Sequence, residues 1–223
     1  MADEMRIQVM NGGPYVVSGG VPLKEMAPVH TFNGEPVDWH VLREIDESRE
    51  MYALCRCGQS NDKPYCDGSH ATATWAEAET ADRGPLATRA KRVEGSGGGV
   101  MLDDESACIG AGFCGTRTTN AWELMSEAGD EARAQAVGMI SMCPSGRLSY
   151  VAEGASAPAE PDLGPEVAIL PGGPLWVRGG IRVESADGTV WEDQNRRNLC
   201  RCGESKNKPF CDGAHSDLNF DER

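Results

Sequence analysis

The sequence predicts a small α+β protein, in which two similar units of short strands are separated by a different, helix-containing segment. Three observations predict this class. The segment Cys55–His70 returns almost unchanged as Cys200–His215. Each copy follows a Gly-Gly-Pro turn, a short run of β-branched or aromatic residues and a Gly-Gly pair, which is typical of short strands joined by tight turns. The segment between the copies contains a helical pattern of apolar residues.

The repeat covers residues 5–76 and 165–223, and it predicts three domains, 1–78, 79–160 and 161–223. In each copy the Gly-Gly-Pro turn and the strand that follows it precede the cysteine motif. An aromatic residue lies at the same distance after the histidine of each copy, and we expect it to pack against the core of its own copy. These aromatic residues are Trp75 and Phe220.

The middle segment lies between two stretches whose composition is typical of flexible linkers, Gly95–Gly99 and residues 153–161. The residues from Asp130 to Met142 predict a helix that Asp130 caps, with Ala132, Ala136, Val137 and Ile140 on one face. Pro144 disfavours a helical conformation for Cys143, so we expect the helix to end there.

Composition excludes several function classes. The chain has 223 residues and a formal net charge of −14, from 35 acidic and 21 basic residues. Nucleic acids and anionic membranes need clustered lysine and arginine, so neither is expected as a partner. No apolar run reaches membrane length, and the start lacks the apolar core of a signal peptide. The nine cysteines therefore indicate metal ligands in a reducing compartment, and we expect a cytoplasmic protein.

Each repeated motif offers three thiolates and one imidazole with the spacing C-x-C-x8-C-x3-H. Cys55 and Cys57 are close enough in sequence to hold one iron, and Cys66 and His70 would share a helix face that holds a second. We expect Asp67 to bind backbone or loop amides rather than metal. Three cysteines and one histidine also form structural zinc sites, although those sites usually use C-x2-4-C spacing. Iron–sulfur chemistry is favoured, and zinc remains an alternative.

Both motifs resemble the CDGSH iron–sulfur domain of the mitoNEET family, whose signature is C-x-C-x2-S-x3-P-x-C-D-G-S/A-H. The resemblance implies a β-cap above each site and one [2Fe–2S] cluster per motif. Members of that family pair two such units about a twofold axis, so the two units here are expected to form an intramolecular pseudo-dimer. The implied ligands are Cys55, Cys57, Cys66 and His70 in the first copy, and Cys200, Cys202, Cys211 and His215 in the second.

The middle segment is similar to the mono-cluster bacterial ferredoxins. Its run from Cys108 to Cys114 carries Ala111 at the position of the central cysteine of a C-x2-C-x2-C motif, and Cys143 precedes a proline as the last ferredoxin ligand does. Three cysteines without a fourth imply a [3Fe–4S] cluster on Cys108, Cys114 and Cys143. The alternatives are a [4Fe–4S] cluster with a further ligand, and a degenerate segment with free thiols.

These features predict a multi-cluster iron–sulfur protein that carries electrons to a redox partner with a basic docking surface, and they predict a monomer. No G-x-G-x-x-G follows a predicted strand, so no nicotinamide or flavin site is expected and an enzyme is the least favoured class. Two alternatives stay open. The chain could transfer or store clusters, since one histidine ligand makes a cluster labile, or it could act as a redox sensor.

Overall fold

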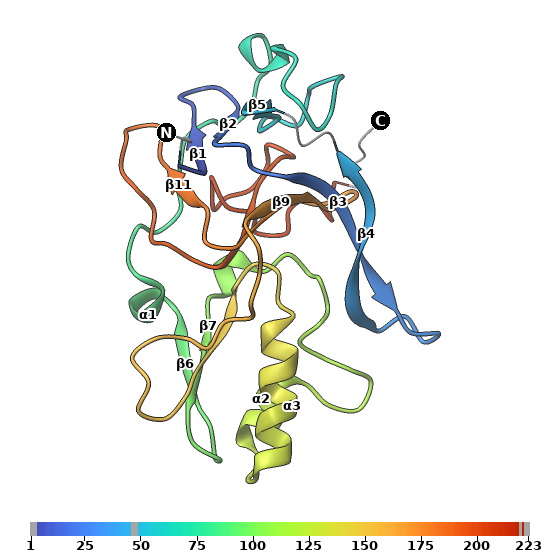
Figure 1. Cartoon of the computed structure of the whole chain (residues 1–223), viewed down its shortest axis with the longest axis vertical. Helices are drawn as coiled ribbons and strands as arrows, with labels where there is room; N and C mark the ends of the chain where they lie inside the picture. Colours follow the sequence, from blue (N-terminus) through green and yellow to red (C-terminus); the bar gives the residue numbers. More distant parts are fainter. Residues whose placement is uncertain (1–3, 46–48, 219, 221–223) are drawn as a thin grey trace.

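The computed structural model describes residues 4–45, 49–218 and 220. Short strands dominate, with three α-helices in the middle of the chain (Figure 1). In chain order the elements are β1 (Arg6–Val9), β2 (Tyr15–Ser18), β3 (Leu23–His30), β4 (Pro36–Ile45), β5 (Met51–Leu54), the 3-10 helix η1 (Ser69–Ala71), α1 (Leu86–Arg89), β6 (Lys91–Glu94), β7 (Val100–Asp103), the 3-10 helix η2 (Glu105–Ala107), α2 (Ala121–Ser126), α3 (Asp130–Ser141), β8 (Leu148–Val151), β9 (Glu166–Ile169), β10 (Leu175–Arg178), β11 (Arg182–Glu184) and β12 (Arg196–Leu199).

The two repeated units exchange strands. One sheet has the order β11-β1-β2-β5, so a strand of the second copy completes the sheet of the first. The other has the order β12-β10-β9-β3-β4, in which β3 and β4 of the first copy extend the sheet of the second. Both exchanged pairs are parallel, β1 with β11 and β3 with β9. Each copy therefore relies on the other for a complete sheet.

The same tight turn opens both copies. In the first, the Met10 amide donates to the Pro14 carbonyl at 3.0 Å and the Gly13 amide donates to the Met10 carbonyl at 3.1 Å. Leu170, Gly173 and Pro174 make the equivalent pair of bonds in the second copy. Gly12 and Gly172 adopt φ values of 58° and 63°, a conformation that glycine reaches without steric cost. The Gly-Gly-Pro signal in the sequence thus marks a real turn in each copy.

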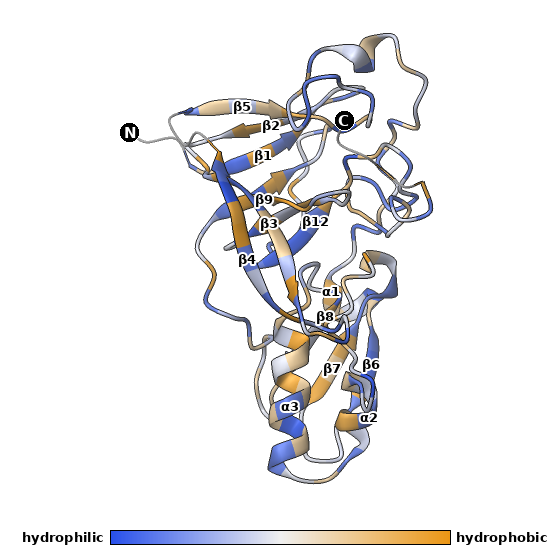
Figure 2. Cartoon of the chain, turned by 90° about the vertical axis from the view of Figure 1, so that its right-hand side faces the viewer, coloured by the Kyte–Doolittle hydropathy of each residue, from blue (hydrophilic) through white to orange (hydrophobic). Residues whose placement is uncertain are grey.

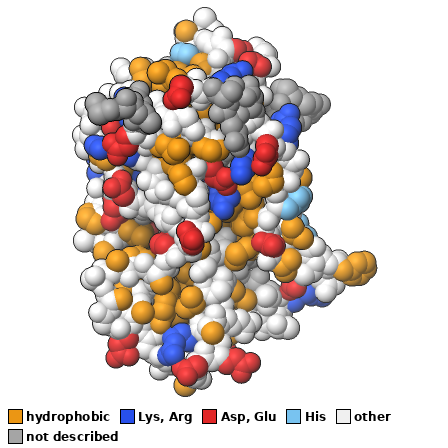
Figure 3. All heavy atoms as spheres, viewed as in Figure 1, with side chains coloured by type: hydrophobic (Ala, Val, Ile, Leu, Met, Phe, Trp, Pro, Cys, Tyr) orange, Lys and Arg blue, Asp and Glu red, His pale blue; other side chains and the backbone are white. Residues whose placement is uncertain are grey.

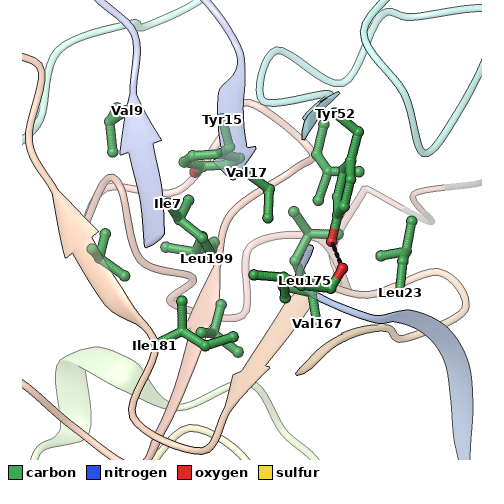
Figure 4. Close-up of a cluster of buried hydrophobic side chains, with 14 of the residues drawn as sticks. Ile7, Val9, Tyr15, Val17, Leu23, Tyr52, Val167, Leu175, Ile181 and Leu199 are labelled. Carbon is green, nitrogen blue, oxygen red and sulfur yellow. Dashed lines mark hydrogen bonds between the residues drawn. The ribbon is translucent and has the colours of Figure 1, made fainter. Parts of the chain in front are cut away.

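One hydrophobic core serves both repeated units, because the inner faces of the exchanged sheets meet (Figure 4). Alternate residues of short strands point to the same face of a sheet, so each strand contributes only two or three side chains. The labelled residues come from both copies: Ile7, Val9, Tyr15, Val17, Leu23 and Tyr52 from the first, and Val167, Leu175, Ile181 and Leu199 from the second.

The middle segment forms its own sheet, of order β6-β7-β8, against which α2 and α3 pack (Figure 2). The prediction of a flexible linker at Gly95–Gly99 is wrong. This stretch is the turn of the β6–β7 hairpin, closed by the Gly95 amide donating to the Gly99 carbonyl at 3.0 Å. Residues 153–161 are also more ordered than a linker, because Ala159 pairs with Tyr150 in an isolated bridge.

The predicted helix is present as α3, and it ends one residue before its expected limit. Ala136 and Ile140 are buried, with Ala132 and Val137 packed beside them, so the predicted face is confirmed. The predicted cap is wrong. Gly129 occupies the cap position without a side-chain bond, and Asp130 lies in the first turn, where its negative charge favours the helix dipole.

Candidate metal centres

The predicted ligands of the first copy lie together just after β5. Cys55 Sγ and Cys57 Sγ are 3.9 Å apart, and Cys66 Sγ is 3.2 Å from His70 Nδ1. The second copy repeats this arrangement after β12. There Cys200 Sγ and Cys202 Sγ are 3.7 Å apart, and Cys211 Sγ is 3.2 Å from His215 Nδ1.

Each site therefore presents its ligands as two pairs. Within the described ranges 4–45, 49–218 and 220, no three His, Cys, Asp or Glu side chains gather as they would around a single metal ion. A tetrahedral zinc site needs four ligands around one point, whereas a binuclear cluster needs two ligands on each of two irons. The paired arrangement fits the binuclear cluster better, with Nδ1 as the ligating histidine atom.

Backbone amides donate hydrogen bonds to two of these cysteine sulfur atoms, which favours the thiolate form. The Gln59 amide donates to Cys57 Sγ at 3.5 Å, and the Gly213 amide donates to Cys211 Sγ at the same distance. The bond between Cys200 and Cys202 lowers the pKa of Cys200 and raises that of Cys202, and burial raises the pKa of Cys211. Since thiolates rather than thiols bind iron, Cys200 is the cysteine of this loop that loses its proton first.

The aspartate of each motif ties its loop together, as predicted. Asp67 accepts hydrogen bonds from the Asn61 amide at 2.8 Å and from the Ser69 amide at 2.9 Å. Those two amides hold the pKa of Asp67 well below its usual range, so the carboxylate stays charged. Asp212 makes the same two bonds, to the Lys206 and Ala214 amides.

The expected helix from Asp67 to His70 is replaced by a shorter 3-10 helix, η1. Gly68 precedes it with φ of 92°. Because this value is left-handed, an α-helix cannot begin at Asp67. The Cys66–His70 pair still forms, because the turn at Gly68 brings His70 Nδ1 close to Cys66 Sγ.

Serine and lysine residues inside each motif brace the loop from within. Ser60 Oγ donates to the Tyr65 carbonyl at 2.6 Å, and Lys63 Nζ donates to the Ser60 carbonyl at 2.7 Å. Ser205 and Lys208 make the equivalent bonds in the second copy. Each lysine thus places a cation within the loop that carries the ligands.

The arginine between the first two cysteines of each motif is buried, with 2% exposure for Arg56 and 1% for Arg201. Arg56 donates to the Met10 and Gly13 carbonyls, and Arg201 donates to the Leu170 and Gly173 carbonyls. Each guanidinium therefore locks its cysteine loop onto the Gly-Gly-Pro turn of its own copy. A buried cation at this place also offsets the negative charge of an anionic cluster.

Trp75 and Phe220 pack differently from the prediction. Each is half-buried and lies against the arginine of its own motif, with the guanidinium carbon 4.8 Å from the ring centre for Arg56 on Trp75 and 5.3 Å for Arg201 on Phe220. An aromatic face attracts a cation. These rings therefore cover the arginines rather than join the apolar core.

The two cysteine loops touch. Cys57 and Cys202 pair through their backbones in an antiparallel bridge. Gly58 and Gly203 follow them with φ of 80° and 84°. A Cβ atom at Gly58 would lie 2.3 Å from the Cys202 carbonyl oxygen, so only glycine permits this approach.

Sequence reasoning missed Tyr15. Its hydroxyl, carried on β2 of the first copy, lies 2.7 Å from the Cys200 carbonyl and 2.9 Å from the Pro209 carbonyl of the second. The second copy has Leu175 at the equivalent position after its Gly-Gly-Pro turn. This difference between otherwise matched segments is the signal that could have revealed it.

The three cysteines of the middle segment surround a cavity of about 150 Å³. Cys108, Cys114 and Cys143 are all half-buried there, and Ala111 lines the same cavity at the position of the missing cysteine. Burial raises the pKa of Cys114, and the neighbouring Cys143 and Cys108 raise it further. The structure therefore brings the three predicted ligands around one space that can hold a multinuclear cluster.

Arg147, which sequence reasoning did not single out, lines this cavity. It binds Asp103 through Nε at 2.7 Å, and this bond and the neighbouring Cys108 raise the pKa of Arg147 above its ordinary value. A permanent cation beside three thiols favours their thiolate forms and balances the charge of a bound cluster.

The middle segment is attached directly to the second copy. A Cβ atom at Gly213 would lie 2.8 Å from the Cys108 carbonyl oxygen, and Asn207 Nδ2 donates to the Ser106 carbonyl at 3.0 Å. Arg196 of β12, with 1% exposure, donates to the Ile140 and Cys143 carbonyls, each at 2.8 Å. Two ligand loops are thus held by backbone contacts to the second copy.

His30 and His40, which lie outside these loops, are exposed. On the face seen in Figure 3, acidic and basic side chains are interspersed among apolar ones and no continuous basic patch is visible among the described residues. No helix within the described part of the chain has the length and apolar character needed to cross a bilayer.

Comparison with known proteins agrees with this geometry. The family model described as "Iron-binding zinc finger CDGSH type" matches residues 12–71 and 172–216. The model described as "Divergent 4Fe-4S mono-cluster" matches residues 98–153 between them. No curated protein and no solved structure gave a significant match to the chain.

The two matched families define an iron–sulfur protein. Within that class, the chain is a tandem CDGSH protein whose two copies flank a mono-cluster, ferredoxin-like segment, which confirms the resemblance found in the sequence.

Proposed function

We propose that this chain is a multi-cluster electron carrier. In this proposal the two repeated sites hold one [2Fe–2S] cluster each, on Cys55, Cys57, Cys66 and His70 and on Cys200, Cys202, Cys211 and His215. The central cysteines hold a [3Fe–4S] cluster, with [4Fe–4S] as the alternative. The clusters supply one-electron chemistry, and the protein positions them, balances their charge and excludes solvent.

One observation carries the proposal: backbone contacts join all three ligand sets in series. Cys57 meets Cys202 across the bridge between the repeated loops, and Gly213 of the second loop meets Cys108 of the central loop. The strand exchange adds support for an intramolecular pseudo-dimer, because it fixes the first two loops against each other. An array of this kind suits the passage of single electrons within one chain.

The surroundings of the thiols also suit a carrier. Arg56, Arg201 and Arg147 each place a cation next to a ligand loop, which stabilises the anionic reduced state of a cluster. The net charge of −14 suits a redox partner with a basic docking surface. None of the nine cysteines forms a disulfide, in keeping with a reducing compartment such as the cytoplasm.

The first test is the iron and sulfide content of anaerobically purified protein, measured with EPR as isolated and after reduction. Seven irons and a signal from the oxidised protein are expected. The reduced protein should then pass electrons stoichiometrically to a one-electron acceptor protein. Loaded protein that reduces no such acceptor would overturn the carrier function.

Cluster transfer is a second candidate, and one observation favours it. Cys66 and His70 of the first copy are only half-buried. A half-exposed histidine ligand is open to solvent and to a receiving protein. Transfer would appear as loss of two irons to an apo-ferredoxin faster than to free chelator, whereas a carrier keeps its iron while it gives up electrons.

A further inference from the structure

The two repeated sites share their ligands but not their surroundings. Gly68 and Gly213 occupy the same motif position with φ of 92° and 91°. A Cβ atom at Gly68 would meet no heavy atom within 4 Å, whereas one at Gly213 would lie 2.8 Å from the carbonyl oxygen of Cys108. The N-terminal loop is therefore open, and the C-terminal loop is pressed against the central site.

Exposure of the ligands follows the same division. His70 and Cys66 of the N-terminal site are half-buried, and Asp67 and Gly68 between them are exposed. At the C-terminal site His215 retains 8% exposure and Cys211 retains 1%. His215 lines a groove of about 360 Å³ that Trp39 and Phe220 also line.

Trp39 explains how the C-terminal site is covered. It lies on β4, in the long hairpin that the N-terminal copy adds to the second sheet. Its ring stacks on Phe113 of the central loop at 4.9 Å and on Trp176 of β10 at 4.7 Å. Its Nε1 donates to the Met142 carbonyl at 3.4 Å, next to Cys143. One side chain thus joins the N-terminal hairpin, the central site and the second sheet.

We propose that the two CDGSH sites have separate tasks. The N-terminal site exchanges electrons with a basic one-electron carrier protein. The C-terminal site is a more buried relay site that passes electrons between the N-terminal site and the central site. The proposal rests on the electron-carrier function above. In the exchange, the reduced carrier protein loses one electron and the N-terminal site gains it, and no covalent bond is made or broken.

The test measures how closely a soluble paramagnetic agent can approach each site in the intact, cluster-loaded protein. A bulky neutral gadolinium chelate is added to the reduced protein, and the EPR relaxation rate of each [2Fe–2S] signal is measured. The variants His70→Cys and His215→Cys assign the signals, since each changes the spectrum of one site. We expect the chelate to enhance relaxation several-fold more at the N-terminal site. Equal enhancement, or a larger effect at the C-terminal site, would overturn the proposal.

A second pair of variants tests the cover over the C-terminal site. Trp39→Ala should raise the enhancement at that site towards the N-terminal value, while Trp39→Phe, which keeps an aromatic ring in the stack, should restore most of the protection. A Trp39→Ala protein with unchanged protection would contradict the assigned role of this side chain.

A matched glycine pair tests the contact with the central site. Gly68→Ala and Gly213→Ala introduce the same strain at φ near 90°, but only the second pushes against Cys108. We expect Gly213→Ala alone to change the EPR signal of the central site. An equal change in both variants would refute a specific connection. These measurements need no redox partner, so they are independent of whether the chain delivers electrons to one.

Discussion

Cys57 and Cys202 pair through their backbones, so a ligand of the N-terminal site and a ligand of the C-terminal site lie side by side although 144 residues separate them in the chain. The glycines that follow them make this approach possible. The bridge lies where the two ligand loops meet, and an added methyl group at Gly58 would clash with the backbone of the other copy.

The variant Gly58→Ala tests that junction. Its new Cβ would overlap the Cys202 carbonyl at 2.3 Å, and its φ of 80° is unfavourable for alanine. Gly34→Ala is the control, because its φ is 83° but no atom lies within 4 Å. We expect the control to lose roughly 1–2 kcal/mol of unfolding free energy and Gly58→Ala to lose about 1–3 kcal/mol more. Denaturant titration followed by circular dichroism measures both, and equal losses would contradict the contact.

Replacing the histidine ligands should shift one potential at a time. In His70→Cys the N-terminal site becomes all-cysteine, and its potential should fall towards the roughly −400 mV of plant-type clusters. His215→Cys should do the same at the C-terminal site. Redox titration followed by EPR measures each potential. If neither variant shifts a potential, the imidazoles are not ligands.

Supplying the missing cysteine should change the central cluster. Ala111 lines the cavity with Cys108, Cys114 and Cys143, so Ala111→Cys provides a fourth ligand. The iron content should rise from seven to eight, and the EPR signal of the oxidised protein should disappear. Ala128→Cys, at an exposed position away from the cavity, is the control and should leave both unchanged. Eight irons in the unaltered protein would instead establish the [4Fe–4S] alternative.

Replacing Arg196 should lower the unfolding free energy more than replacing an exposed arginine does. Its guanidinium binds the Cys143 carbonyl at 2.8 Å and the Glu160 carboxylate at 2.6 Å. Arg196→Met removes the buried donor to the Cys143 carbonyl and one partner of the partly exposed Glu160 carboxylate, so we expect a loss of about 1–3 kcal/mol in unfolding free energy together with loss of the central cluster. Arg92→Met, which removes an exposed pair with Glu94, should cost less than about 1 kcal/mol. Urea unfolding and visible absorbance distinguish them.

Tyr52 should cause part of the loss of stability at alkaline pH. Burial, and next the nearby Tyr65, raise the pKa of Tyr52 above its ordinary value, while its hydroxyl donates to the Val21 carbonyl at 2.9 Å. The folded state keeps this proton longer than the unfolded state, so the contribution is full below about pH 10 and is lost as pH rises through the folded pKa.

The variant Tyr52→Phe isolates that effect. It should cost about 1 kcal/mol at neutral pH, from the lost hydrogen bond, and its stability should fall less steeply than that of the parent above pH 10. Parallel slopes in the two proteins would show that other groups cause the alkaline loss. Urea midpoints from pH 8 to pH 12 provide the comparison.

The ligand chemistry was readable from the sequence because its signals are local. The spacing within Cys55–His70 limits how far apart four ligands can lie, and the two copies repeat it. The amide-binding role of Asp67 is local as well, since both of its partners lie within six residues. Helix α3 was predictable from the period of its apolar residues.

The contacts between copies were not readable, because no local pattern encodes them. Alternation of apolar residues shows that β1 and β3 are strands, but not that each joins the sheet of the other copy. Nothing in the sequence around Arg196 or Trp39 indicates the contacts that these residues make. Their roles depend on segments more than 30 residues away. The Gly95–Gly99 stretch shows the opposite error, since its glycines serve a tight hairpin turn rather than a flexible linker.

The strand exchange also has a consequence for synthesis on the ribosome. The sheet of the N-terminal copy lacks its edge strand until residues 182–184 have been made, and β3 has no parallel partner until residues 166–169 appear. Domains usually fold as the chain emerges, beginning at the amino end. Here the sheet of the first copy is complete only when nearly the whole chain has been made, so the two copies should reach their final fold together.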